Sequence, residues 1–468
     1  MDWFGSSGYD VARFVLQRGI AAVFVLAFVS SARQFPALLG ERGLLPVPRY
    51  LARVGRPPGP TLFHWRYSDT LFRAVAWAGA LIALSVVLGL PQRGPAWVPM
   101  LAFLALWLLY MSIVNVGQVF YGFGWEILLL ESGFLAAFLG SDQTTTPAVT
   151  LFLFRWLVFR LEFGAGMIKM RGDPVWRDLT ALYYHHETQP MPNPLSWWFH
   201  HLPKPLHKVE VAGNHVAQLV VPFFLFAPQP IANVAAAIVI ATQCWLVLSG
   251  NFAWLNAITI VLAFSAVELP TADSSTGSPA WFVVVVLAMG ALMLVLSWWP
   301  LRNLFSRNQV MNGSFNRWRL ANAYGAFGSI TRERYEVVVE GATGDPDTGD
   351  WFEYGFHGKP GEPGRMPRQF APYHLRLDWL MWFLALGSPG LHWFVPFLNK
   401  LLEADSATLK LLRHDPFAGQ RPDWVRARLF SYRYTTWYEW RETGDWWVRE
   451  PLGDFVPSLG HSRGSGDG

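Results

Sequence analysis

Apolar runs long enough to cross a membrane recur between residues 11 and 299. A helix needs about 20 apolar residues to cross the hydrocarbon core of a bilayer. Seven such runs carry at most two titratable residues each: 11–29, 71–90, 96–118, 212–227, 231–250, 252–267 and 281–299. The pattern predicts a helical membrane domain that begins close to the N-terminus.

Two further runs are apolar but contain charged residues. They cover 121–140 and 151–170, and they bring the expected count to eight or nine spans. The number of spans stays open because 121–140 could be a re-entrant segment, which enters and leaves the membrane on the same side. The run 252–267 is also short for a span. The fold class predicted is therefore a polytopic all-α membrane bundle.

The composition changes after residue 302, where charge, Gly and Pro rise and the long apolar runs stop. Alternating residues predict strands at 335–340, 351–356 and 429–440, and two apolar stretches predict helices at 377–386 and 394–402. We expect a transmembrane domain over 1–302 with long loops at 31–69 and 171–210. A mixed, β-containing extramembrane domain is expected over 303–459, followed by a disordered tail at 460–468.

Composition and charge support this picture and exclude some functions. The chain is 52% hydrophobic and only 15% charged, which is low for a soluble protein of 468 residues. The net charge of +4 does not indicate a nucleic-acid partner, and the apolar runs imply membrane lipids as partners. The single cysteine, Cys244, excludes disulfide chemistry within the chain.

Basic residues indicate how the loops are arranged about the membrane. Loop 31–69 contains six arginines against Glu41 and Asp69. Because basic loops tend to stay in the cytoplasm, the charges place loops 31–69 and 171–210 on one cytoplasmic side. With nine spans, the C-terminal domain would lie on that side as well.

The charged residues inside the apolar runs are the first candidate site. Glu126 and Glu131 lie in 121–140, and Arg155, Arg160, Glu162 and Lys169 lie in 151–170. Arg155, Glu162 and Lys169 are seven residues apart, so they share one helix face, whereas Arg160 lies off it. A charge inside a membrane is costly unless it is paired or faces a cavity. The six residues therefore predict either a buried ion network that fixes helix packing or a polar cavity for a substrate or partner.

The second candidate is the histidine-rich loop after residue 171. Tyr184, His185, His186 and Glu187 are consecutive, and more histidines follow at 200, 201 and 207. Imidazoles and carboxylates could bind a metal, but the spacing matches no standard zinc pattern. We therefore predict neither a metal nor a cofactor here.

Several strings in this sequence resemble the lipase maturation factor family. They cover 122–134, 155–169, 179–189, 249–256 and 371–383, in that order along the chain. The last string adds a C-terminal signature of His374, Arg376, Asp378 and Trp379.

The resemblance implies a multi-pass membrane protein that helps exported lipases fold and assemble. Its animal members reside in the endoplasmic reticulum and serve lipoprotein lipase and its relatives, with the C-terminal domain meeting the client in the lumen. That side conflicts with the one favoured by the arginines. The single cysteine departs from the animal members, and the high Arg, Ala and Gly content suits a bacterial member in the plasma membrane.

A more distant likeness leaves an enzymatic alternative open. The string 164–169 is similar to the lysine-bearing segment of the vitamin K-dependent γ-carboxylase. That likeness implies a membrane enzyme with Lys169 as a candidate catalytic residue. His185, Glu126 or Glu131 could act with it, and His185 is the second catalytic candidate. The maturation-factor resemblance covers far more of the chain and favours a chaperone over an enzyme.

Overall fold

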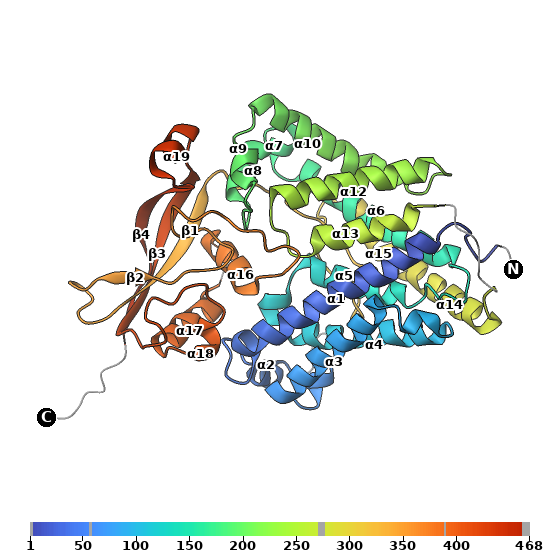
Figure 1. Cartoon of the computed structure of the whole chain (residues 1–468), viewed down its shortest axis with the longest axis horizontal. Coiled ribbons are helices and arrows are strands. Elements are labelled where there is room, and N and C mark those ends of the chain that lie inside the picture. The colour runs from blue at the N-terminus through green and yellow to red at the C-terminus, as the bar shows by residue number, and fades with distance from the viewer. Residues whose placement is uncertain (1–2, 56–58, 270–276, 388–389, 461–468) are drawn as a thin grey trace.

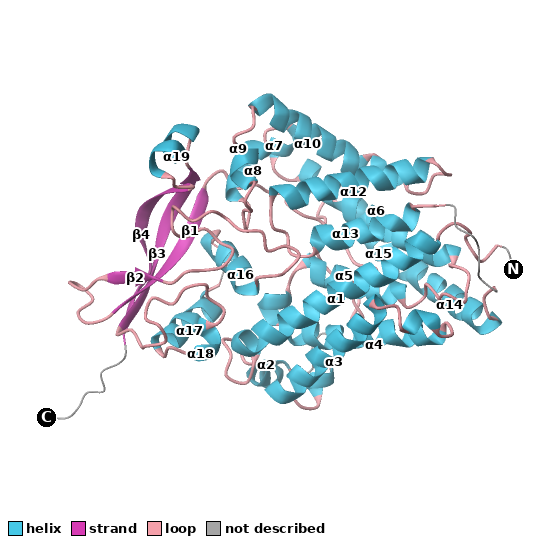
Figure 2. Ribbon diagram, viewed as in Figure 1, coloured by secondary structure: helices cyan, strands magenta, loops and turns pink. Residues whose placement is uncertain are grey.

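The helical and β-rich parts of the chain lie at opposite ends of the molecule. The computed structural model describes residues 3–55, 59–269, 277–387 and 390–460. Figure 1 shows a bundle of long helices with a small sheet stacked on one end, and Figure 2 shows all strands gathered at that end. This arrangement confirms the predicted fold class. The tail expected to be disordered falls, from residue 461 on, outside the described residues.

Five helices among the described residues are long and apolar enough to cross a membrane. They are α1 (Asp10–Leu39), α3 (Asp69–Val87), α4 (Trp97–Val116), α12 (Ile231–Ser249) and the continuous pair α14 (Ala280–Leu296) and α15 (Trp298–Phe305). Their outward sides are apolar: Leu294 and Val295, for example, are 72% and 71% exposed. Such a surface is stable only against lipid or another apolar partner.

The other four expected runs form helices that are shorter or charged. They are α5 (Gly124–Ala136), α6 (Ala148–Arg171), α10 (Lys204–Leu219) with α11 (Val221–Phe224), and α13 (Leu255–Ala263). With 13 residues, α5 is about 20 Å long, which is shorter than a hydrocarbon core. It packs against α1, α4, α6 and α13, and its residues from Trp125 on are all buried. α5 is thus the central helix of the bundle.

Short helices fill the loops. They are α2 (Val47–Val54) in loop 31–69, and α7 (Pro174–Arg177), α8 (Leu182–Thr188) and α9 (Ser196–His200) in loop 171–210. Short 3-10 helices form at Leu62–His64, Pro91–Arg93, Gln118–Tyr121 and Phe264–Ala266. In Figure 1, α2, α8 and α9 all lie at the end that carries the sheet, so the two long loops share that end.

The sheet has four antiparallel strands in the order β2-β1-β3-β4. The strands are β1 (Arg334–Ala342), β2 (Trp351–Glu353), β3 (Trp424–Tyr434) and β4 (Trp447–Gly460). Helices α16 (Arg376–Ala385) and α17 (Leu391–Leu402) pack against it, and α18 (Ser406–Leu409) follows them. Trp197 of α9 enters a separate aromatic core with Tyr432 and Trp447. Loop 171–210 is therefore part of the packing of the sheet.

The strand expected over 429–440 ends earlier than the pattern predicts. Residues 424–434 are strand, but Trp437–Thr443 forms helix α19. Thr436 and Glu439 form a capping box, in which each side chain accepts a hydrogen bond from the backbone of the other. This exchange satisfies backbone donors at a helix start, so it outweighs the alternation of aromatic residues.

Residues 306–333 connect the bundle to the sheet and run partly inside the bundle. A Cβ atom at Gly164 of α6 would lie 2.5 Å from the carbonyl oxygen of Tyr324. On the other side of α6, a Cβ atom at Gly166 would lie 2.6 Å from the side chain of Leu219. The two glycines therefore allow the connector and α10 to approach α6 closely. The domain boundary at 302/303 stays a prediction, because residues beyond it pack among the helices.

Candidate functional site

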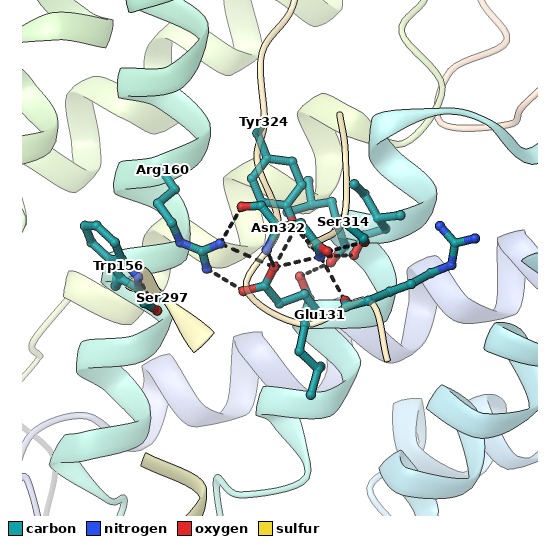
Figure 3. A network of polar contacts seen from close by, with 12 residues as sticks. Glu131, Trp156, Arg160, Ser297, Ser314, Asn322 and Tyr324 are labelled. Carbon is teal, nitrogen blue, oxygen red and sulfur yellow. Dashed lines mark hydrogen bonds and ion pairs between the residues drawn. The ribbon is translucent and has the colours of Figure 1, made fainter. Parts of the chain in front are cut away.

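Glu131 at the centre of α5 is the hub of the first buried polar network, shown in Figure 3. Its fully buried carboxylate pairs with the guanidinium of Arg160 on α6. Tyr324 donates its hydroxyl hydrogen to the same carboxylate at 2.8 Å, and the backbone and side-chain nitrogens of Asn322 donate at 3.0 and 2.9 Å. Arg160 also donates to the carbonyl of Asn322 at 2.7 Å. The network thus ties the connector to α5 and α6.

Glu126, at the start of α5, is the hub of a second network that reaches the C-terminal domain. Arg376 of α16 donates to Glu126 at 2.6 Å and to the carbonyl of Phe120 at 2.8 Å. The hydroxyl of Tyr110 on α4 donates to the same carboxylate. The guanidinium of Arg376 lies 3.5 Å from the centre of the Tyr121 ring. All of these side chains are buried, so the pair fixes α16 to the bundle.

The rest of the C-terminal signature divides between two roles. Trp125 of α5 donates its indole hydrogen to Nδ1 of His374 at 3.3 Å, and the ring of Trp379 packs edge-on against Trp125. Burial and the charge of Arg376 lower the pKa of His374 to about 4, so the ring is neutral and can accept this bond. Asp378 instead accepts from the backbone nitrogen of Gly358 at 2.6 Å and holds its own domain's loop.

Of the three residues predicted to share one face of α6, only Glu162 and Lys169 belong to a common hydrogen-bond cluster. Gln218 of α10 bridges the last two: it donates to Glu162 at 3.2 Å and accepts from Lys169 at 2.9 Å. Gln243 of α12 also donates to Glu162, at 2.6 Å. Arg155 lies apart and donates to the carbonyl of Ser265 at 3.0 Å. Two of the three predicted residues therefore form one cluster.

This third cluster borders a cavity of about 660 Å³. Glu162, Lys169 and His185 all line it, together with Asn214, Gln218 and Asn256. Lys169 donates to Asn214 at 2.9 Å and lies 4.6 Å from the ring centre of Trp176. The remaining lining is mainly apolar and aromatic, from the bundle, the connector and α16. A cavity of this size with a few converging polar groups is typical of a site for a small amphiphilic ligand.

The four residues of the histidine-rich loop point in different directions. His185 lines the cavity and packs against the rings of Phe252 and Phe327, which also contact each other. Burial lowers the pKa of His185 to about 3, which keeps its imidazole neutral. Arg332 lies over the ring of Tyr184, 5.1 Å from its centre. His186 packs against His207 of α10, 5.6 Å away between ring centres.

Glu187 connects this loop to the sheet. Its carboxylate accepts from the backbone nitrogen of Tyr434 at 2.7 Å, and its carbonyl accepts from Arg334 at 2.8 Å. Burial raises the pKa of Glu187 above its usual range. The loop string that resembles the family therefore joins α8 to β1 and β3.

The sequence interpretation missed a buried ion cluster on β1. Arg334 donates to Glu336 at 2.6 Å, and Lys359 lies 2.9 Å from the same carboxylate. All three side chains are nearly or fully buried. The alternation of a β-strand could have paired Arg334 with Glu336, because residues two apart point to the same face of a strand. The partner Lys359 could not be identified from that alternation.

The fold and these networks define an integral membrane protein with a polar-cored helical bundle and a C-terminal sheet domain docked on it. The chain belongs to the lipase maturation factor family. Residues 11–273 match the family described as "Lipase maturation factor transmembrane domain", and residues 320–457 match "Lipase maturation factor C-terminal domain". This confirms the resemblance drawn from the five strings.

The relatives cover nearly the whole chain. Lipase maturation factor 1 of Bos taurus is 39% identical over 96% of this chain and 89% of the relative. Lipase maturation factor 1 of Homo sapiens is 38% identical over 96% and 88%. Lipase maturation factor 2 of Homo sapiens is 29% identical over 97% and 83%. No solved structure matches the chain.

Proposed function

We propose that this protein is a membrane-embedded maturation factor that assists the folding or assembly of exported lipases or other secreted proteins. The observation that carries the proposal is the relationship to lipase maturation factor 1 across 96% of the chain. This chain matches both the transmembrane and the C-terminal domain of the family, so the relationship covers the helical and the sheet-bearing parts.

The sheet domain is the part that we propose to meet the client. It is held rigidly, because Arg376 pairs with Glu126 inside the bundle and Trp197 is buried against the sheet. Its helix α19 presents aromatic side chains to the solvent: Tyr438 is 76% exposed and Trp437 is 41% exposed. Exposed aromatic clusters on an ordered domain are typical of protein-binding surfaces.

A complementation experiment tests the proposal. A host that lacks this gene and secretes a lipase is supplied with the wild-type chain, and secreted lipase activity is measured per unit of lipase antigen. We expect low specific activity without the chain and recovery with it. The double variant Trp437→Ala, Tyr438→Ala should recover less, whereas Trp65→Ala, an 84% exposed tryptophan in the helical part, should recover fully. Equal specific activity with and without the chain would exclude the proposed function.

The proposed role requires the sheet domain to lie on the side to which clients are exported. We therefore propose this side for the domain, in the plasma membrane if the protein is bacterial, against the side favoured by the arginines of loop 31–69. A phosphatase fused to the C-terminus should be active, since it folds only outside the cytoplasm, and a fluorescent protein at that position should be dark. The reverse pair of results would place the domain in the cytoplasm.

The enzymatic alternative is less well supported. The amine of Lys169 donates to the amide oxygens of Asn214 and Gln218 and lies near the Trp176 ring, and these contacts hold the side chain in place. Such contacts explain a buried lysine without a catalytic role. Lys169→Met should therefore support lipase maturation in the same assay. Loss of maturation by a folded Lys169→Met protein would favour the alternative.

A further inference from the structure

Three side chains near the cavity have the composition of a transition-metal site. His186 lies on α8, and His207 and Glu210 lie one turn apart on α10. One ligand atom from each can be chosen so that all three lie within 4.8 Å of one another. None of the three takes part in the networks around Glu126, Glu131 or Lys169.

His186 is the member whose surroundings most need an explanation. Its side chain is almost completely buried, and neither ring nitrogen has a hydrogen-bond partner. A buried polar group without a partner costs about 1–3 kcal/mol. A ring nitrogen with a free lone pair is able to bind a metal ion.

The other two residues are held by outer partners in the way that metal ligands usually are. Nε2 of His207 lies 3.3 Å from the carbonyl oxygen of His200, and this oxygen can only accept. The hydrogen of His207 is therefore on Nε2, and the lone pair is on Nδ1, which is buried and has no partner.

Glu210 is oriented in the same manner. Its Oε1 accepts the indole hydrogen of Trp245 at 2.7 Å, and its Oε2 lies 4.0 Å from Nε2 of His186. One carboxylate oxygen is thus occupied and the other faces the histidines. Outer hydrogen bonds of this kind fix the tautomer and orientation of metal ligands.

We propose that His186, His207 and Glu210 bind a zinc-class divalent metal ion. Two imidazole nitrogens and one carboxylate oxygen form a known zinc ligand set, in which a fourth position stays open. Binding would give His186 the partner that its buried ring lacks. This proposal reverses the expectation of no metal, which rested on the spacing of histidines along the chain. Here α8 and α10 are brought together by folding, so local spacing carries no signal.

Metal content and a cobalt spectrum test the site directly. The full-length protein is purified in detergent with a tag that contains no histidine, equilibrated with zinc and desalted, and its metal is measured by mass spectrometry. We expect about one zinc ion per chain. The metal-depleted protein should give intense visible absorption bands with Co²⁺, which one equivalent of Zn²⁺ should abolish. His186→Gln, His207→Gln and Glu210→Gln should each lose the metal.

A matched control and a weaker variant make the result specific. His215→Gln removes another imidazole of α10, one that bonds the carbonyl of Trp176, and it should retain the metal. Trp245→Phe keeps the three ligands but frees Glu210, so zinc should bind about 10–100-fold more weakly. The proposal is wrong if the folded wild-type protein holds no zinc and gives no cobalt bands. It is equally wrong if a folded Glu210→Gln or His207→Gln protein gives the wild-type spectrum.

Discussion

The polar groups around α5 and those beside the cavity differ in what surrounds their charges. Glu126 and Glu131 on α5 are each paired with a buried arginine and receive further hydrogen bonds from tyrosine or asparagine. Glu162 on α6 receives its hydrogen bonds from the neutral amides of Gln218 and Gln243, and it lines an open cavity. The α5 networks pair each carboxylate with an arginine and hold segments together. The α6 cluster lies on the lining of a cavity that a ligand could occupy.

The largest effect is expected where a buried arginine loses the carboxylate that pairs with it. Glu126→Gln leaves the guanidinium of Arg376 buried without a counter-charge, which should lower the free energy of unfolding by about 3–5 kcal/mol. Thermal unfolding in detergent, followed by tryptophan fluorescence, measures the loss. Glu362→Gln is the control, because its pair with Arg413 is at the surface and should contribute less than about 1 kcal/mol. Equal melting of the two variants would contradict the structural role of Glu126.

A smaller effect is expected for one hydrogen bond to the second α5 carboxylate. Tyr324→Phe keeps the ring but removes the donor to Glu131, and a hydrogen bond to a charged group contributes about 1.5–3 kcal/mol. The same unfolding measurement applies. Tyr438→Phe makes the identical chemical change at an exposed position and should leave the melting temperature unchanged. If both variants melt like the wild type, Tyr324 does not stabilise the connector.

The cavity cluster should tolerate the loss of its charge better. In Glu162→Gln, the amides of Gln218 and Gln243 can rotate to match the new side chain, so we expect a loss of about 0.5–1.5 kcal/mol. The thermal unfolding of Glu162→Gln is compared with that of Glu126→Gln in the same detergent. A loss as large as that of Glu126→Gln would show that the charge of Glu162 is as important for stability as that of Glu126.

The sequence could predict the membrane class and the charged residues, but not how the charges pair. Helix periodicity puts Arg155, Glu162 and Lys169 on one face, yet only Glu162 and Lys169 share a cluster. A period fixes which way a side chain points on its own helix. It does not say which neighbouring helix lies there, and that depends on tertiary packing.

Glu126 shows the same limit over a longer distance. The ion network expected from the sequence grouped Glu126 with the cations of 151–170, but its arginine comes from α16, 250 residues later. The sequence identifies Arg376 only as part of a family string. Likewise, no standard spacing links His186 to His207 and Glu210, because α8 and α10 are separate helices that only folding brings together. Pairings between distant segments are the part that required the structure.

The smallest effect is expected at an exposed ion pair between the connector and loop 171–210. Arg332, just before β1, donates twice to Asp173 at the start of α7, at 2.9 and 2.8 Å. These bonds lower the pKa of the Asp173 carboxyl to about 2. A lowered pKa means that the pair stabilises the fold above the unfolded pKa of about 3.9 and loses this contribution as the pH falls toward 2.

Because Asn caps a helix as well as Asp does, Asp173→Asn removes the charge alone and should cost less than about 1 kcal/mol at neutral pH. The difference in melting temperature from the wild type should shrink as the pH is lowered below 4. A difference that stays constant over that range would mean that the Asp173 charge does not contribute to stability.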